Sequence, residues 1–349
     1  MKQQIEKRED MLFENISRII NEAKSQVIKT VNTTMVSTYF EIGRIIVEHE
    51  QGGKDRAEYG KETLKELSLK LSKEFGNGFS LSNLKNMKQF FITYREKTKS
   101  QSLISQSSNS LDLFDLSWTH YLMLIRIDDE LKRSFYEIET KKESWSVREL
   151  KRQMDSALFE RLALSKDKDK VFELAQKGQL LTKAEDVVKD PYILEFLGLE
   201  EKSEYSETEF EQAIIDNLQK FLLELGKGFT FVARQKRISF DERHFYIDLV
   251  FYNRLLKSFV IIDLKKGDLK HQDIGQMQMY VNYYDREVKT EDENRTIGII
   301  LCMDKSDMLV KFTLPEENDQ IFASKYKLYL PTKEELVQYI ENIKRKIEN

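Results

Sequence analysis

The stretch FYIDLVFYNRLLKSFVIIDLKKG, residues 245–267, decides how the C-terminal half of this chain folds. It contains two apolar runs, residues 245–252 and 258–265, which are joined by a polar turn at Asn253 and Arg254. Short apolar runs on either side of a polar turn pair as a β-hairpin. We therefore predict two antiparallel strands in this stretch.

Three charged residues interrupt these otherwise apolar strands. The first run carries only Asp248, and the second carries only Asp263 and Lys265. Because side chains alternate along a strand, Asp263 and Lys265 share one face, and hairpin pairing can bring Asp248 beside them. Two neighbouring carboxylates repel unless a divalent cation lies between them, and an oxygen-only pair suits Mg²⁺ or Mn²⁺.

A cation at this place would support the hydrolysis of a phosphodiester. It would lower the pKa of a bound water and stabilise the charge that builds on the phosphate, while Lys265 would orient that water or neutralise the phosphate. The alternative is that Asp248 and Asp263 are strand-end residues facing solvent, with Lys265 as their ion-pair partner. Each residue alone is more often that, but their joint placement favours the metal site.

The segments around the hairpin predict a mixed α/β domain. Helical and strand periods alternate, and glycine or polar turns separate them. In chain order we expect a helix over residues 208–225 ending at Gly226, a strand over 229–240, the hairpin, a helix over 271–285, a buried strand within 296–304, a strand near 326–330, and a final helix capped by Thr332 and Glu335.

The first 160 or so residues instead repeat apolar positions at spacings of three and four, which indicates successive amphipathic helices. Residues 61–75 and about 80–94 predict two helices separated by a glycine-containing turn, and residues 97–109 predict an exposed loop. The whole chain is therefore expected to be an α+β multidomain protein, with an all-α N-terminal domain over 1–165, a charged helical connector over 166–190 and an α/β domain over 191–349.

Composition excludes several other classes of protein. The single cysteine, Cys302, rules out an intramolecular disulfide, and neither a secretory signal nor eighteen consecutive apolar residues occur. We therefore expect a soluble, cytoplasmic protein. A formal charge of −4 means that nucleic-acid contacts would rest on local basic patches. The Gly-Lys pairs at 53–54 and 60–61 lack the rest of a phosphate-binding loop.

The segments FYIDLVFYNR, VIIDLKKG and GQMQMYVNYYD, in this order, resemble the PD-(D/E)xK nuclease superfamily. They resemble most closely the YhcG-like bacterial proteins, which join a helical N-terminal region to such a domain. The N-terminal segments YFEIGRIIVEHE and LSWTHYLMLI resemble this family too, so the likeness spans the chain. It implies a restriction-endonuclease-like core of order αβββαβ, metal ligation by Asp248, Asp263 and the carbonyl of Leu264, and a catalytic Lys265.

The same resemblance implies further site residues. A glutamate on the first core helix completes the site in many members, and Glu211 is the best candidate here, with Glu207 as the other. Gln276 and Tyr280 lie one helical turn apart and match a Gln-x-x-x-Tyr element of some members, although a core tyrosine beside an incidental glutamine fits equally well. Asp263 stands where many relatives have Glu, which could alter the metal preference.

Basic residues near the predicted site would contact a phosphate backbone, although each alone could be a solvated strand edge. They are Arg234, Lys236, Arg237, Arg254, Lys257, Lys266 and Lys270. Residues 61–95 are compatible with a DNA-binding helix-turn-helix, but generic helical packing or dimerisation is favoured. Trp118 and Trp145 are expected in a core or an interface.

These observations predict a Mg²⁺- or Mn²⁺-dependent DNA endonuclease of recombination, repair or defence against foreign DNA. Its expected partners are DNA, a second copy of the chain and restriction or repair proteins, with no membrane. The alternative is a non-catalytic DNA-binding or scaffold accessory of a restriction or repair system. A ribonuclease would use the same residues.

Overall fold

The computed structural model describes residues 2–51, 57–104, 114–164, 168–199, 205–240 and 242–348. Its contacts divide the chain into two compact units, Met1–Lys151 and Arg152–Asn349. The predicted helical domain extended further, to residue 165. The difference arises because helical periodicity cannot tell which core a helix joins: α7 (Leu158–Leu164) packs against the C-terminal helix α13 (Lys333–Glu348).

The described part of the first unit is entirely helical, as predicted. Gly76 follows the second helix with a φ of +89°, a conformation that glycine adopts without strain, and so ends that helix. The elements are α1 (Lys2–Gln51), α2 (Ala57–Phe75), a 3-10 turn (Asn77–Phe79), α3 (Leu81–Ile104), α4 (Trp118–Leu124), α5 (Glu130–Lys142) and the start of α6 (Val147–Asp155).

The loop predicted over residues 97–109 is wrong in its first part, since α3 continues to Ile104. Once a helix is formed, each added residue gains one backbone hydrogen bond, so a helix can continue into a polar stretch of sequence. Residues 105–109 lie outside the described residues.

Aromatic rings and one close helix crossing build the core of the first unit. The ring of Phe90 lies 4.9 Å from those of Phe114 and Tyr121 and 5.4 Å from Trp118, measured between centroids, so Trp118 lies in a core as predicted. Helices α1 and α3 meet at the buried Gly43, where an added Cβ would lie 2.1 Å from the carbonyl oxygen of Met87.

The second unit is built on a six-stranded sheet of order β1-β6-β5-β4-β3-β2. Strands β2, β3 and β4 are antiparallel neighbours, and β4, β5, β6 and β1 pair in parallel. The strands are β1 (Tyr192–Ile193), β2 (Phe229–Phe240), β3 (Arg243–Asn253), β4 (Ser258–Leu264), β5 (Ile297–Cys302) and β6 (Ile321–Lys327).

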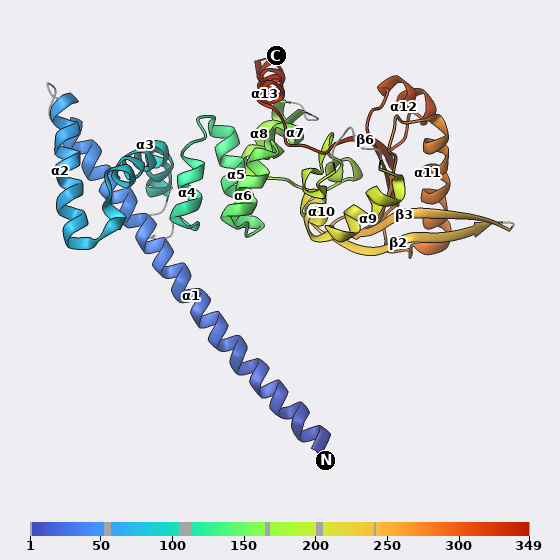
Figure 1. Cartoon of the computed structure of the whole chain (residues 1–349), viewed down its shortest axis with the longest axis horizontal. Helices are drawn as coiled ribbons and strands as arrows, with labels where there is room; N and C mark the ends of the chain where they lie inside the picture. The colour runs from blue at the N-terminus through green and yellow to red at the C-terminus, as the bar shows by residue number, and fades with distance from the viewer. Residues whose placement is uncertain are drawn as a thin grey trace. The chain divides into compact units, whose positions relative to one another are not determined.

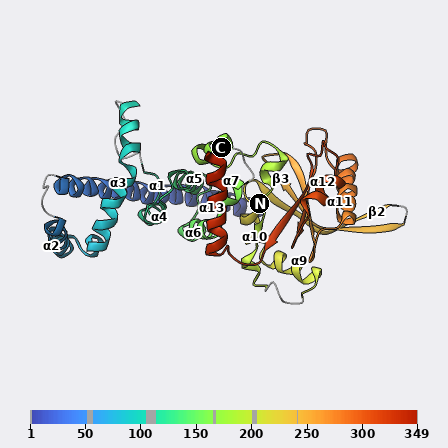
Figure 2. The ribbon, with the colours of Figure 1, turned by 90° about the horizontal axis from the view of Figure 1, so that it is seen from above.

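Helices cover both faces of this sheet (Figures 1 and 2). On one face α9 (Glu207–Asp216) and α10 (Leu218–Leu225) pack against a layer that includes Phe251 and Ile262. On the other face α11 (His271–Tyr283) and α12 (Asp307–Thr313) pack against a layer that includes Val250, Ile261 and the buried Cys302. The order α9/α10, β2, β3, β4, α11, β5 is the predicted restriction-endonuclease-like αβββαβ core.

Three element boundaries in this core differ from the predictions. The helix predicted over 208–225 is broken at Asn217, whose side chain donates to the carbonyl of Ala213 and competes with the helical ladder. Helix α11 runs on as a π-helical turn, Tyr284–Val288. Strand β6 begins at Ile321, earlier than predicted, because its first residues pair with β5.

The segment between the two predicted domains is only partly helical where it is described. It contains α8 (Lys168–Lys177) and the 3-10 turn Ala184–Val187, while residues 165–167 are not described; a further 3-10 turn, Glu195–Leu197, follows in the predicted α/β domain. No helix of the described residues is long and apolar enough to span a membrane.

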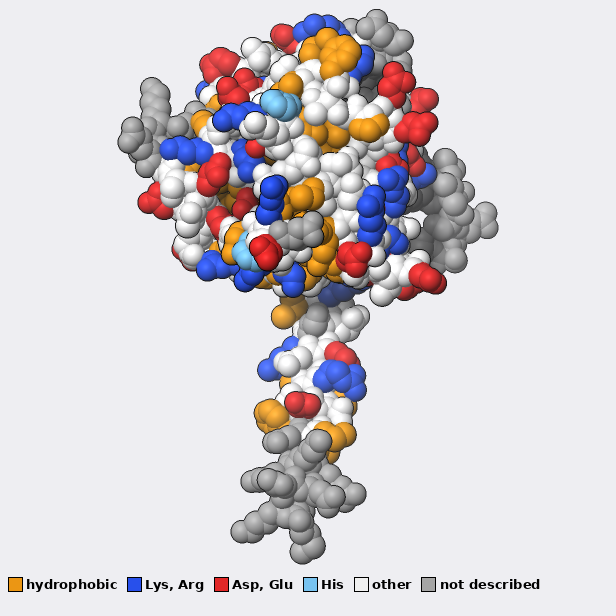
Figure 3. Space-filling model, turned by 90° about the vertical axis from the view of Figure 1, so that its right-hand side faces the viewer, with side chains coloured by type: hydrophobic (Ala, Val, Ile, Leu, Met, Phe, Trp, Pro, Cys, Tyr) orange, Lys and Arg blue, Asp and Glu red, His pale blue; other side chains and the backbone are white. Residues whose placement is uncertain are grey.

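Acidic and basic side chains are interspersed over the face of the molecule seen in Figure 3. This mixture agrees with the small formal charge of −4. A phosphate backbone would therefore meet local groups of basic side chains and not one broad positive surface.

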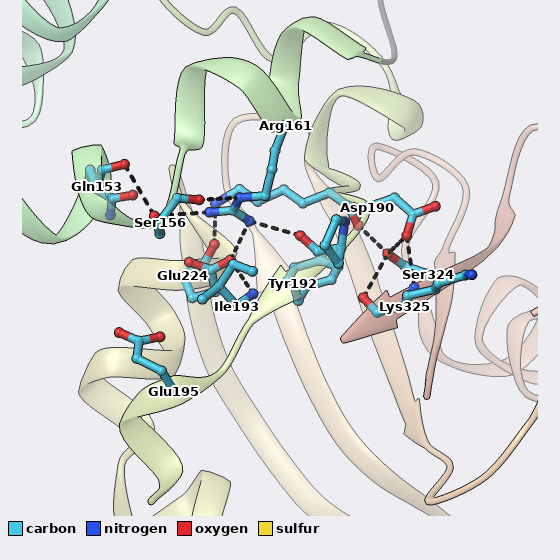
Figure 4. Close-up of polar contacts among 12 residues, drawn as sticks. Gln153, Ser156, Arg161, Asp190, Tyr192, Ile193, Glu195, Glu224, Ser324 and Lys325 are labelled. Carbon is cyan, nitrogen blue, oxygen red and sulfur yellow. Dashed lines mark hydrogen bonds and ion pairs between the residues drawn. The ribbon is translucent and has the colours of Figure 1, made fainter. Parts of the chain in front are cut away.

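A buried ion-pair cluster ties the segment around α6 and α7 to the core of the second unit (Figure 4). Arg161 and Glu224 are both fully buried, with 2.8 Å between Nη1 and Oε1, and the same guanidinium donates to the carbonyl of Pro191. Glu224 also accepts from the backbone N–H of Ile193 at 3.0 Å, and Arg152 lies 3.4 Å from it. Burial alone would raise the pKa of Glu224, but its cationic neighbours outweigh burial and lower that pKa to about 2.

Candidate active site

Asp248 lies on β3 at the point where this strand leaves β4. The β3–β4 ladder ends with the pair Leu249 and Ile262, whereas β3 continues to pair with β2 as far as Arg243. The Asp248 carboxylate fills this opening, and its Oδ2 accepts a hydrogen bond of 2.8 Å from the backbone N–H of Leu264. The strand end thus fixes the carboxylate beside the last residues of β4.

Asp263 and Lys265 come from the end of β4 and the residue after it. The side chain of Asp263 is 2% exposed, and its Oδ2 lies 2.8 Å from Nζ of Lys265. This close contact with an ammonium stabilises the charged form of the Asp263 carboxylate. The structure therefore brings Asp248, Asp263 and Lys265 together, as the alternation of the strands predicted.

The three groups shift one another's pKa values. Burial, with the neighbouring Asp248 carboxylate, raises the pKa of Asp263 to about 7, against the pull of Lys265. Burial also raises the pKa of Asp248, although the Leu264 N–H and the Lys265 ammonium oppose it. Burial disfavours the charge of Lys265, but the carboxylate of Asp263 outweighs that effect and raises the pKa of Lys265.

The two carboxylates and their raised pKa values fit a cation site in which side chains supply only some of the ligands. Two carboxylates share one ammonium, and the repulsion between them helps to raise the pKa of Asp263, so a divalent cation beside them would relieve that repulsion. Within the described ranges no three His, Cys, Asp or Glu side chains form a ready-made metal cluster. Main-chain oxygens, waters or substrate would have to complete the shell of Mg²⁺ or Mn²⁺.

Glu211, on the buried side of α9, extends the acidic group. Its Oε2 accepts a hydrogen bond of 2.6 Å from Nε2 of Gln235, and the same nitrogen lies 3.1 Å from Oδ1 of Asp248. Burial, and to a lesser degree Asp248, raises the pKa of Glu211. Glu207, the other predicted candidate, is exposed at the start of α9 and accepts only a long contact of 3.4 Å from the N–H of Lys266.

Gln235 is the residue that sequence reasoning missed. It lies opposite Asp248 in the β2–β3 pairing, and its backbone has a φ of +45° there. No sequence motif marks such a conformation in a glutamine, so no signal in the chain could have identified it.

Gln276 and Tyr280 of α11 are hydrogen-bonded to each other, one helical turn apart. Tyr280 is fully buried and its hydroxyl donates to the carbonyl of Tyr246 at 2.9 Å. Burial raises the pKa of Tyr280, and the acidic group of Asp263 and Asp248 is close enough to contribute. The pair thus connects α11 to the part of β3 that precedes Asp248.

The predicted nucleic-acid contacts fall into separate places. Arg234, Lys236 and Arg237 lie on β2, and Arg237 contacts the ring of His244 across the hairpin. Lys266 lies 5.3 Å from the ring centre of Tyr205, and Lys270 is the N-cap residue of α11. Arg254 and Lys257 are in the β3–β4 turn, beyond the last residue of β3, and Arg254 is roughly 20 Å from Asp248 at strand spacing, so the structure does not bring them to the carboxylates.

Two family models and one relative match this chain. The YhcG PDDEXK nuclease domain matches residues 185–341, and the DUF1016 N-terminal domain matches residues 15–161. A curated protein of Escherichia coli (strain K12), named "Putative nuclease YhcG", is 36% identical over 345 residues, which cover 93% of this chain and 92% of that protein.

Two solved structures have weaker likeness to part of the chain. A repair endonuclease from Pyrococcus abyssi is 21% identical with a TM-score of 0.26, covering 37% of this chain and 50% of that one. EndoMS in its apo form is 15% identical with a TM-score of 0.24, covering 38% and 49%. Both TM-scores are too low to bear on fold or function.

The full-length relative and the two domain models agree with each other and with the helical first unit and the αβββαβ core described above. The resemblance seen in the sequence is thereby confirmed. The chain belongs to the family of YhcG proteins, in which a DUF1016 N-terminal domain precedes a YhcG PDDEXK nuclease domain.

Proposed function

We propose that this protein is a metal-dependent endonuclease that hydrolyses phosphodiester bonds of DNA at the group formed by Asp248, Asp263 and Lys265. The observation that carries the proposal is the meeting of the buried Asp263 carboxylate, the half-buried Asp248 carboxylate and one ammonium where β3 and β4 separate. Family membership supports it independently, because the domain that contains these residues is described as a nuclease domain.

In this proposal each residue has a separate task. Asp248 and Asp263, with the carbonyl of Leu264, hold Mg²⁺ or Mn²⁺; the bound ion supplies a more acidic water and stabilises negative charge on the phosphate. Lys265, kept in place by Asp263, donates to a phosphate oxygen or orients the attacking water. Hydrolysis forms a bond from the water oxygen to phosphorus and breaks the bond to one bridging oxygen, which gains a proton.

Basic residues close to these groups are proposed to hold the DNA backbone. Arg234, Lys236 and Arg237 lie along β2, in the stretch of hairpin that flanks Asp248, and Lys266 and Lys270 follow Lys265 directly. The distant Arg254 and Lys257 would contact DNA only away from the cleaved bond. Gln276 and Tyr280 are proposed to support the site through their contact with Tyr246.

The test replaces Asp263 or Lys265 by Ala and compares cleavage of duplex, single-stranded and branched DNA, and of RNA, with Mg²⁺ or Mn²⁺ and with a chelator. We expect both variants and the chelator to abolish cleavage, and Asp307→Ala, a change at an exposed carboxylate, to leave it intact. Undiminished cleavage by Asp263→Ala would refute the site. If DNA binds but no cation binding depends on Asp248 and Asp263, the fold serves as a scaffold.

The cellular setting is proposed from family membership alone. It is the cytoplasm, in recombination, repair or defence against foreign DNA, with restriction or repair proteins as partners. Two coordinated cuts in a duplex need two active sites, so we propose a homodimer on DNA. Light scattering of the DNA complex tests this, and a strict monomer that cuts both strands at once would contradict it.

A further inference from the structure

Gln235 occupies a strained position in β2, directly beside the acidic group. Its neighbours pair regularly with β3, Arg234 with Leu249 and Lys236 with Ile247, so the irregular residue stands opposite Asp248. Its φ of +45° lies in the left-handed region, which costs a residue with a Cβ roughly 1 kcal/mol or more. A conformation of this cost persists only where other contacts hold it.

The contacts that hold it are made by the side-chain amide. Nε2 lies 2.6 Å from Oε2 of Glu211 and 3.1 Å from Oδ1 of Asp248. A primary amide has two N–H groups, so it can donate one to each carboxylate. A neutral donor thereby links helix α9 to strand β3.

This link opposes a repulsion that would otherwise separate the two acids. Glu211 and Asp248 carry like charges, and neither accepts an ion pair from a lysine or arginine in the described structure. The hydrogen bond from Gln235 is the contact described for the Glu211 carboxylate. Without it, the carboxylate would gain by turning towards the nearby Arg234, whose charge already acts on it, or towards water.

We propose that Gln235 is a positioning residue that holds Glu211 against Asp248 and so makes Glu211 the third carboxylate at the cation site. The inference rests on the proposed function, since it concerns the same site. Gln235 acts through the two carboxylates and not on the phosphodiester. Cation affinity should therefore depend on an uncharged side chain that offers no acidic ligand of its own.

The test measures Mn²⁺ binding to the full chain by calorimetry for Gln235→Ala, Glu211→Ala and the double variant. We expect Gln235→Ala to weaken Mn²⁺ binding about tenfold and the double variant to bind no more weakly than Glu211→Ala alone, because Gln235 acts through Glu211. Saturating Mn²⁺ should restore kcat of Gln235→Ala towards that of the unmodified protein, which a folding defect would not allow. Gln212→Ala, whose amide contacts Asp216 and Arg234, is the matched control.

The outcomes separate this inference from the proposed function. Unchanged Mn²⁺ affinity in Gln235→Ala, or additive losses in the double variant, would overturn the role of Gln235. If Asp263→Ala abolishes Mn²⁺ binding in the same series, the cation site stands and only the inference fails. If Asp263→Ala binds Mn²⁺ normally, the proposed function fails with it.

Discussion

The Lys265 ammonium has two roles in the proposed site: it forms an ion pair with Asp263, and it is proposed to contact a phosphate oxygen of the substrate. Lys265→Met removes the charge and keeps the length of the side chain. We expect cleavage to fall at least about 100-fold, the usual cost of losing a charge-stabilising group. Mn²⁺ affinity should hold or increase, since a competing cation has left the carboxylates. Kinetics and calorimetry on the same variant provide both readouts.

Asp263→Asn should lose both properties, and Lys311→Met, at an exposed lysine of α12, should lose neither. A loss of Mn²⁺ binding in Lys265→Met would show that the lysine organises the carboxylates, contrary to the separation of tasks proposed here.

The alternation of side chains along a strand was enough to predict that Asp248, Asp263 and Lys265 lie together. A charge in an apolar strand is conspicuous, and period-two spacing puts Asp263 and Lys265 on one face. Gln235 could not be predicted, because no sequence pattern marks a glutamine with a left-handed backbone angle. Glu211 was already preferred to Glu207 from the resemblance, and it lies on the buried side of α9 whereas Glu207 is exposed.

Helices α1 and α3 cross so closely at Gly43 that the crossing leaves no room for a side chain there. In an exposed helix Gly→Ala stabilises by up to about 1 kcal/mol. At Gly43 the new Cβ would meet the backbone oxygen of Met87 at 2.1 Å, and a backbone atom cannot turn away. We expect Gly43→Ala to destabilise the first unit by about 2 kcal/mol or more, measured by denaturant unfolding.

Gly275→Ala is the matched change, since no atom lies within 4 Å of its added Cβ on α11. It should be neutral or stabilising. Equal effects of the two substitutions would mean that α1 and α3 do not approach each other so closely in solution.

The β2–β3 hairpin provides a prediction about DNA binding. Beyond Asp248 its two strands pair only with each other, and β2 carries Lys236 and Arg237 there. If they contact phosphates, replacing both with Ala should weaken binding to all DNA sequences alike and reduce the slope of log affinity against log salt by about two. Fluorescence anisotropy at several salt concentrations measures both effects.

Lys311→Ala on α12 serves as the control for a generic loss of charge, because Lys311 is exposed and lies outside the hairpin. An unchanged salt slope in the double variant would place the DNA elsewhere on the protein.

Helices and strands were predicted correctly where one hydrophobic periodicity continued between residues that clearly end an element. Strand β2 has the predicted ends, Phe229 and Phe240, because glycine precedes it and a polar turn follows. The break at Asn217 was not visible, since asparagine occurs within helices and its local hydrogen bond decides the outcome. The start of β6 depended on pairing with β5, a contact that the chain's own periodicity does not contain.

For the molecule as a whole, the Arg161–Glu224 cluster makes stability depend on pH. Glu224 has a folded pKa of about 2 against an ordinary value of 4.5, so its contribution is fully present above about pH 4.5 and is lost as pH falls through 2. Glu224→Gln should destabilise the second unit by several kcal/mol at pH 7, because Arg161 is left buried without its partner. The difference in the free energy of unfolding between Glu224→Gln and the unmodified protein should decrease by about 3 kcal/mol from pH 5 to pH 2.

Urea unfolding across this pH range tests the prediction, with Glu316→Gln at an exposed site as control. A difference that stays constant down to pH 2 would mean that another group titrates in place of Glu224.

The same cluster explains why the domain boundary was predicted too late. Arg161 lies within the span of the DUF1016 N-terminal model, residues 15–161, yet its guanidinium is buried beside Glu224 of α10. A sequence reveals that a helix is amphipathic but not which partner receives its buried arginine.

Cys302, the chain's single cysteine, is the last residue of β5 and lies in the core layer that α11 covers, and burial raises the pKa of its thiol to about 11. At neutral pH the thiol is almost entirely protonated and is shielded from solvent, so we expect thiol-directed reagents not to react with it. The native cysteine therefore need not be removed before labelling. A cysteine introduced at an exposed position would be the one that reacts with a fluorophore or spin label.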